Sequence, residues 1–256
     1  MSMKYIKKFL ERVSGFLYFK LTNIRIGAIR VAHDDMKGAF NALSIIAKKY
    51  YGVPETTLWE AKYPGPETGD ASDLASLFKK YGSDKSTRHN YYLIYENVLR
   101  GKRNEPIAIF EMGIGKPSAS VEKSRASSQA FRDWAPKARI YGADIKNDLL
   151  FQEDRITTYF ADQTNLDTLN ALSSKITEKF DLIIDDGWHS PWANFNTIIF
   201  ALPLLKENGV MVVEDINKSH LEFWPALIAA LGPQYNCELV KMRYQTVCII
   251  SKKYLQ

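Results

Sequence analysis

Residues 181–190 read DLIIDDGWHS, and this stretch joins a structural element to a group of reactive side chains. The apolar run from Leu182 to Ile184 has the composition of a buried strand. The run ends in two aspartates, a glycine and His189. Ligands of open α/β sheets bind outside the carboxyl ends of the strands. Acids at such a place need a partner, which can be a metal, a substrate or each other.

Short apolar runs alternate with helical stretches from residue 105 onward. This alternation predicts an α/β fold in which helices cover a mostly parallel sheet. Helices are expected near 127–134, 165–177, 192–206 and 221–231. Seven strands are expected, and the last two are close enough in sequence to form a C-terminal antiparallel hairpin. Their ranges are 107–112, 139–145, 156–161, 181–186, 210–216, 237–244 and 246–252.

The first 70 residues are organised differently. Residues 1–50 carry apolar side chains at helical spacing, and residues 52–70 are rich in Pro and Gly, as in a linker. The basic N-terminus has no apolar run long enough for a membrane span. It could lie on a membrane surface, but packing on the domain or on a second subunit is favoured. We therefore predict a helical region and linker over 1–70, a ligand-binding domain over 71–256, and a homo-oligomer, dimeric or larger.

Composition narrows the class of protein. Hydrophobic residues make up 46% and charged residues 25% of the chain, which are ordinary values for a globular protein. The net charge of +5 comes without a long Lys/Arg block, so it suits anionic small molecules better than nucleic acid. Cys237 and Cys248 lie in apolar segments without a C-x-x-C motif. We therefore expect two buried thiols and a cytoplasmic protein.

Each of the first five predicted strands ends in an acid. Asp144 follows the second strand and Asp162 the third, and either could instead cap a turn or a helix. The first strand leads into an E-x-G-x-G motif, whose glycines allow a backbone to approach a ligand closely. The motif comprises Glu111, Gly113 and Gly115, and the fourth and fifth strands end in the pairs Asp185-Asp186 and Glu214-Asp215.

An NAD-dependent sugar oxidoreductase is one alternative for such a sheet. The dinucleotide fingerprint requires a third small residue three positions after Gly115. Ser118 stands there, directly after Pro117, in a segment that is long and polar for a tight phosphate turn. The oxidoreductase is therefore the less favoured alternative.

Three more motifs narrow the predicted class of protein. They are YGSDK (81–85), IDDGWH (184–189) and VVEDI (212–216). With the E-x-G-x-G motif and the acids after the second and third strands, they resemble class I S-adenosylmethionine (SAM)-dependent methyltransferases. The resemblance is to the metal-dependent macrolide-sugar O-methyltransferases of the mycinamicin and macrocin type and to related sugar O-methyltransferases. It covers roughly residues 74–220. Trp188, where that family usually has a small residue, and the long segment 116–126 depart from the pattern.

The resemblance implies a Rossmann-like methyltransferase domain over 71–256 and a role for each strand-end residue. Glu111 and Gly113 would face the methionine part of SAM, with Gly115 beside them. Asp144 would bind the ribose hydroxyls and Asp162 the adenine amino group, with Gln163 and Asp185 also on the cofactor side. Asp186, Glu214 and Asp215 would bind Mg²⁺ or Mn²⁺, and His189, assisted by Asp186, would be the catalytic base.

These residue types suit the methylation of an alcohol. A hydroxyl is a poor nucleophile at neutral pH, so a cation must stabilise the developing alkoxide and a base must take the proton. Three carboxylates match a hard ion such as Mg²⁺, and an imidazole is a workable base near its ordinary pKa. Gly187 permits a sharp turn, so Asp186 and His189 can share a pocket while Asp185 points elsewhere, in a supporting position.

The loop YGSDKSTRHNYY (81–92) is a candidate lid over the acceptor. Lys85, Arg88 and His89 could meet an anionic group and Tyr91 could stack on a sugar or base; an exposed loop without a role is an equal alternative. Trp188 is a further candidate for the acceptor pocket. Mild basicity favours a phosphorylated or nucleotide-activated sugar of bacterial polysaccharide or capsule biosynthesis. A natural-product glycoside, as in the macrolide pathways, is the alternative.

Overall fold

The structure, a computed structural model, describes residues 38–39, 41–50, 57–58, 73–115 and 124–253. The predicted helices before residue 38, most of the predicted linker and most of the long segment 116–126 lie outside these ranges. Residues 41–50 are helical, as predicted, and Ser44 donates a hydrogen bond to the backbone carbonyl of Glu222. The division at residue 70 and the oligomeric state stay predictions.

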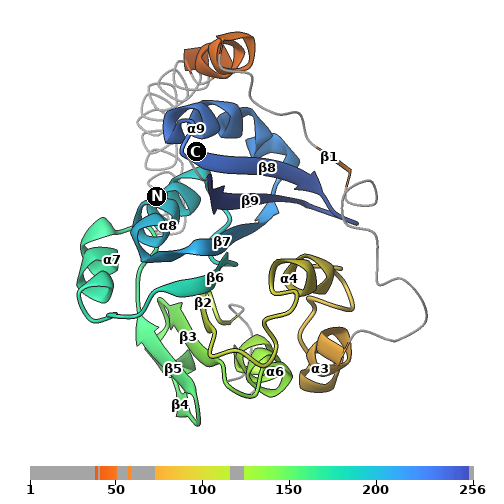
Figure 1. The fold of residues 1–256 in the computed structure, drawn as a ribbon. Coiled ribbons are helices and arrows are strands. Elements are labelled where there is room, and N and C mark those ends of the chain that lie inside the picture. Colours follow the sequence, from red (N-terminus) through yellow and green to blue (C-terminus); the bar gives the residue numbers. More distant parts are fainter. Residues whose placement is uncertain (1–37, 40, 51–56, 59–72, 116–123, 254–256) are drawn as a thin grey trace, which may run out of the picture.

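A nine-stranded sheet organises the described residues (Figure 1). Its strand order is β1-β8-β9-β7-β6-β2-β3-β5-β4. The strands from β7 through β5 run parallel, whereas β9 is antiparallel to both β7 and β8. The strands are β1 (Thr57–Leu58), β2 (Ala108–Met112), β3 (Arg139–Asp144), β4 (Gln152–Glu153), β5 (Ile156–Phe160), β6 (Phe180–Asp185), β7 (Leu205–Ile216), β8 (Tyr235–Lys241) and β9 (Thr246–Lys252).

Seven of these strands and the C-terminal hairpin confirm the sequence prediction. The two-residue strands β1 and β4 were not predicted; β1 lies in the range assigned to the linker and pairs in parallel with β8. The helix expected over 192–206 ends at Ala201 and continues as a 3₁₀ turn, Leu202–Leu204. Pro203 has no N–H with which to extend the α-helix, so β7 begins at Leu205, before the predicted residue 210.

Helices cover both faces of the sheet (Figure 1). One core cluster joins the sheet to α3 (Asp73–Tyr81), α4 (Tyr92–Val98) and α6 (Ala126–Trp134). The other joins it to α7 (Leu166–Ser173), α8 (Pro191–Ala201) and α9 (Trp224–Leu231). Within β2, Ile109 packs in the first cluster and Ala108 and Phe110 in the second. Burial on both faces explains why such strands read as continuous apolar runs.

The order of the strands reverses beside β2. From β2 the chain moves outward through β3 and β5, and β6 then returns to the opposite side of β2. Ligands of open α/β sheets bind at such a switch point, outside the carboxyl ends of the strands. The E-x-G-x-G motif and the DDGWH stretch follow β2 and β6, so the fold brings them together. Within the described residues, no helix has the length and apolar character needed to cross a membrane.

Candidate active site

A cavity of about 790 Å³ opens at the carboxyl ends of β2, β6 and β7. Its walls come from five segments: residues 82–91, the E-x-G-x-G motif, the start of α6, the loop after β6 and the end of β7. The cavity brings together twelve of the residues that the sequence analysis assigned to the site: Lys85, Arg88, His89, Tyr91, Glu111, Gly113, Gly115, Asp186, Trp188, His189, Glu214 and Asp215.

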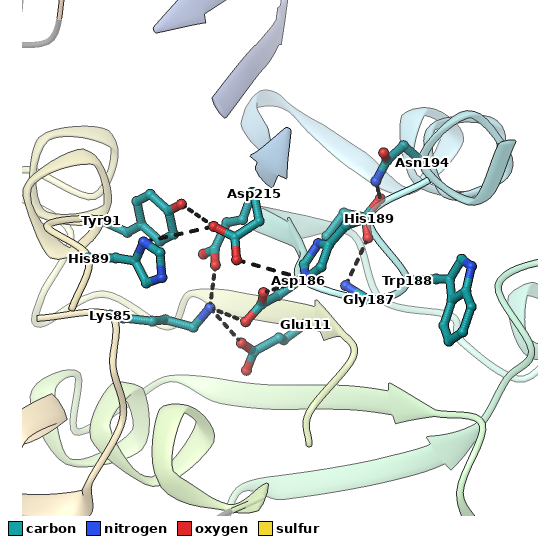
Figure 2. Close-up of polar contacts among 12 residues, drawn as sticks. Lys85, His89, Tyr91, Glu111, Asp186, Gly187, Trp188, His189, Asn194 and Asp215 are labelled. Atoms are coloured by element: carbon teal, nitrogen blue, oxygen red, sulfur yellow. Dashed lines mark hydrogen bonds and ion pairs between the residues drawn. The ribbon is translucent and has the colours of Figure 1, made fainter. Parts of the chain in front are cut away.

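Lys85 is buried at the centre of the acidic residues (Figure 2). Its Nζ lies 2.7 Å from Asp186 Oδ2, 2.7 Å from Glu214 Oε2 and 3.2 Å from Glu111 Oε1. The predicted role of Lys85, to meet an anionic acceptor from a lid, gains no support from this buried placement among carboxylates. Burial alone would lower the pKa of this ammonium, but the charges of Asp186, Glu214 and Glu111 raise the pKa well above its usual value.

Asp186, His189 and Asp215 form a second group. Asp186 belongs to both groups, because Lys85 contacts its Oδ2 and His189 faces its Oδ1. The Nε2 atom of His189 lies 3.8 Å from both Asp186 Oδ1 and Asp215 Oδ2. One ligand atom from each of the three residues lies within 4.8 Å of the others, close enough to share a metal ion. This set differs from the predicted one, because His189 takes the place that the sequence analysis gave to Glu214.

Glu214 nevertheless fits a metal site. Its Oε2 is taken by Lys85, while its Oε1 is buried without a hydrogen-bond partner in the described part of the chain. Burial raises the pKa of this carboxyl to about 7, although the neighbouring ammonium of Lys85 acts in the opposite direction. A buried oxygen without a donor next to two more carboxylates is the environment that a divalent cation would satisfy.

A β-bulge allows the consecutive residues Glu214 and Asp215 to face one cavity. Successive side chains of a regular strand point to opposite faces of the sheet. Here the pairing of β7 with β9 shifts between Val213 and Ile216, so two residues of β7 oppose one of β9. Val213 and Ile216 both pack in the core cluster of α7, α8 and α9. Asp215 itself has a left-handed backbone, with a φ of 52°.

His89 and Tyr91 hold Asp215 from the side opposite His189 (Figure 2). The Tyr91 hydroxyl donates a hydrogen bond to Asp215 Oδ1, and His89 Nδ1 lies 3.8 Å from the same oxygen. The two rings are stacked, with centroids 4.7 Å apart. Burial, together with the charges of Glu214 and Asp215, raises the pKa of the Tyr91 phenol, so it stays a donor. Neither side chain is free on a lid.

Asp185 and Gln163 lie beneath the loop that carries His189. Asp185 accepts hydrogen bonds from Gln163 Nε2, Gly187 N and Asn194 Nδ2, and burial raises its pKa to about 6. Gln163 Oε1 accepts from the backbone N–H of Trp188 at 2.8 Å. Neither side chain lines the cavity. Their predicted role as cofactor ligands gains no support from this placement, which suits a support for the loop.

Gly113 is required by both its backbone and its surroundings. Its φ is 84°, in the left-handed region that glycine adopts without cost. A Cβ atom here would lie 2.4 Å from the backbone oxygen of Asp186 and 2.6 Å from Gly187 Cα. The E-x-G-x-G motif therefore lies directly against the loop after β6, as a backbone contact that no side chain could permit.

The other residues expected on the cofactor side are already bonded within the protein. Asp144 accepts hydrogen bonds from the backbone N–H groups of Gly115 and Lys146, and Asp162 accepts from Thr164. The helix cap that Asp162 might have supplied comes from Asn165. Asp144 and Asp162 do not line the described cavity, whereas Gly115 does. Their predicted contacts with SAM stay predictions.

Two supporting residues were not found from the sequence. Ser127, in α6, donates a hydrogen bond to Glu111, and Asn194, in α8, donates one to Asp185. Both are buried, and polar residues on the buried side of a helix were the available signal. Trp188 stands apart from the acidic residues in Figure 2, at the cavity edge, and is 72% exposed.

The strand order, the glycine-containing turn after β2 and the acids at the following strand ends define a class I methyltransferase fold. A solved structure of the MycE methyltransferase from mycinamicin biosynthesis, in complex with Mg and SAH, matches 72% of this chain and 55% of its own, with a TM-score of 0.58 and 24% identity. A second MycE structure, which also contains the macrolide, matches with a TM-score of 0.57 and 22% identity. No family model matches the chain.

Sequence relatives agree with the predicted resemblance. A tetracenomycin-rhamnoside 2'-O-methyltransferase of Streptomyces olivaceus is 32% identical over 164 residues, which are 63% of this chain and 41% of the relative. Demethylmacrocin O-methyltransferase of Streptomyces fradiae is 31% identical over 160 residues, or 62% and 39%. The similarity to sugar O-methyltransferases is thus confirmed, and the chain spans about two fifths of the length of these relatives.

Proposed function

We propose that this chain is a SAM-dependent O-methyltransferase that acts on a sugar hydroxyl with the help of a divalent metal ion. One observation carries the proposal: acids from the ends of β2, β6 and β7 meet His189 at one cavity, beside the glycine turn of a methyltransferase fold. The named relatives are sugar O-methyltransferases, which agrees with that chemistry.

The chain's own residues would divide the work as follows. Asp186, Asp215 and Oε1 of Glu214 would hold the metal ion, which would stabilise negative charge on the acceptor oxygen. His189 would accept the hydroxyl proton as the acceptor oxygen takes the methyl group of SAM, with a C–O bond formed and the C–S bond broken. The imidazole of His189 also lies near the carboxylates of Asp186 and Asp215, so it could instead bind the metal ion. The experiments must distinguish this role from that of the base.

Cofactor binding would fall to the strand ends nearer β3 and β5. Gly113 and Gly115 give SAM a close approach to the backbone, with Glu111 at the methionine end. Asp144 and Asp162 would accept hydrogen bonds from the ribose hydroxyls and the adenine amino group. Both hydrogen bonds that Thr164 donates to Asp162 go to Oδ1, so Oδ2 is the oxygen that we assign to the adenine amino group.

The acceptor we propose is the sugar of a glycosylated natural product. The relatives are named for rhamnosyl tetracenomycin and demethylmacrocin, and one MycE structure contains mycinamicin VI. These names support a glycoside acceptor, and none of them mentions a capsule polysaccharide or a nucleotide-activated sugar. Arg88, exposed at the cavity, and Trp188 are the residues we assign to the acceptor.

The test is a screen for methyl transfer. The full chain is incubated with SAM, Mg²⁺ and either rhamnosylated polyketides, macrolide glycosides or nucleotide-activated sugars, and products are read by mass for one added methyl group. EDTA should stop the reaction and added Mg²⁺ or Mn²⁺ should restore it. Methylation of nucleotide sugars alone would refute the glycoside, and full turnover in chelator would refute the metal.

A further inference from the structure

The proposed chemistry does not use the buried Lys85 ammonium, which lies inside the cavity. Its side chain is 3% exposed, and its Nζ contacts the carboxylates of Glu111 in β2, Glu214 in β7 and Asp186, directly after β6 (Figure 2). An ammonium group has three N–H donors, so these contacts satisfy all of them. Lys85 itself lies in the loop between α3 and α4. The loop thus supplies a fixed positive charge to the ends of the central strands.

This ammonium separates the carboxylate oxygens into two sets. It binds Asp186 Oδ2 and Glu214 Oε2. The opposite oxygens stay available: Asp186 Oδ1 faces His189, and Glu214 Oε1 has no partner in the described residues. The available oxygens, together with Asp215, are those that we assign to the metal ion. A carboxylate held by one oxygen keeps the other at a defined position.

Charge gives a second reason for a fixed cation at this place. Glu111, Asp186, Glu214 and Asp215 all line one cavity, and like charges at neighbouring strand ends repel each other. A metal ion that contacts only the outer oxygens leaves Glu111 and the inner oxygens uncompensated. Lys85 is placed against those oxygens, so it and a metal ion would occupy separate sides of the carboxylates.

We infer that Lys85 is a positioning residue, which orients Asp186 and Glu214 for the divalent metal ion and does not itself touch the acceptor. This inference rests on the metal site of the proposed function. The competing explanation is that the ammonium merely fills the position of the metal ion and leaves when the ion binds. The two explanations predict opposite changes in metal affinity when the lysine is removed.

The experiment compares Mn²⁺ binding by the wild type and by Lys85→Ala, using the electron paramagnetic resonance signal of free Mn²⁺. We expect the dissociation constant to rise by about tenfold or more in the variant, as for other residues that orient metal ligands. Lys206→Met is the matched control, because Lys206 also pairs with a buried acid, Asp181 at 2.6 Å, far from the cavity. Its Mn²⁺ affinity should equal that of the wild type.

Chemical rescue supplies a second readout. The n-propylammonium ion contains the atoms that Lys85→Ala removes, and the residue lines an open cavity that the ion can enter. We expect n-propylammonium to restore Mn²⁺ affinity, and turnover where an acceptor is known. Tetramethylammonium carries the same charge without N–H donors and should restore neither. If Lys85→Ala does not fold, Lys85→Met replaces it in the binding measurement.

The outcomes separate this inference from the proposed function. A variant that binds Mn²⁺ as tightly as the wild type, or more tightly, refutes positioning and supports competition for the ion's place. Weaker binding that the amine restores supports positioning, even if no sugar acceptor is ever methylated, because the binding measurement needs no acceptor. Wild type that methylates a sugar but shows no Mn²⁺ binding refutes this inference and the metal, while the transfer reaction stands.

Discussion

His189 and Asp215 share a backbone conformation that is uncommon for residues other than glycine. Their φ angles are 53° and 52°, and such left-handed residues cost about 1–3 kcal/mol each. The two side chains meet at 3.8 Å across the cavity. The surrounding contacts, from the Ser190 cap of α8 and from Tyr91, hold both residues in place. Strain at these two positions aims the side chains that we assign to chemistry.

Replacing His189 tests its role as base. His189→Ala should lower turnover by about two to four orders of magnitude, because the acceptor hydroxyl loses its proton acceptor. Affinity for SAM, measured by calorimetry, should stay unchanged. His220→Ala, in a 3₁₀ helix outside the cavity, is the control and should retain full turnover. Parallel losses of Mn²⁺ affinity and turnover in His189→Ala would instead assign the imidazole to the metal ion.

Gly113 allows a clean comparison of strain with steric clash. Gly113→Ala should abolish binding of S-adenosylhomocysteine, because its Cβ would overlap the backbone of Asp186 and Gly187. Gly101→Ala has a similar φ, 77°, with open space around the added atom. It should lower the free energy of unfolding by about 1 kcal/mol and leave ligand binding intact. Equal effects of the two variants would show that the contact between Gly113 and the loop after β6 is not needed for ligand binding.

At the scale of elements, Asp181 ties the start of β6 to its neighbours. It accepts hydrogen bonds from Ala108 N, Lys102 and Lys206, at 3.0, 3.3 and 2.6 Å. Burial alone would raise the pKa of Asp181, but these donors and the lysine charges outweigh burial and hold the pKa below its usual range. The carboxylate therefore stabilises the fold in its ionised form.

The stabilisation by Asp181 should depend on pH in one direction. A carboxyl whose pKa is lower in the folded state contributes above its unfolded pKa, about 3.9, and this contribution is lost as the pH falls through the folded value. Asp181→Asn should cost about 1–3 kcal/mol in urea unfolding at pH 7, and less as the pH is lowered below 4. Asp154→Asn, on an exposed ion pair, should change little. A cost independent of pH would contradict this account.

Elements were easier to predict than the contacts between them. The apolar runs and the acids at their ends predicted the seven main strands, because burial on both faces and a strand-end ligand site leave local patterns. The bulge at Glu214 and Asp215 leaves no such local pattern, because one extra residue at the end of a strand does not change the composition of the apolar run. Lys85 was misplaced for another reason: its partners Glu111, Asp186 and Glu214 are distant in sequence, so its loop reads as polar and exposed.

At the scale of the whole molecule, ligands that bind only the folded chain should raise its melting temperature. Binding at a concentration of 100 times the dissociation constant stabilises by about 2.7 kcal/mol. For a domain of this size that is a shift of roughly 5–10 °C. S-adenosylhomocysteine and Mn²⁺ should each produce such a shift in thermal denaturation. Glu214→Gln should reduce the Mn²⁺ shift and keep the other; no Mn²⁺ shift in the wild type would remove the metal ion from the site.

The extra residue in β7 also matters to anyone who redesigns this protein. A designer seeking a more regular ladder would delete Asp215 and restore continuous pairing with β9. The edited chain would gain an orderly sheet and lose the second of two adjacent acids on the same side of it. Such a deletion would raise the thermal stability and abolish the activity at the same time, because the irregular pairing is what places both acids at the cavity.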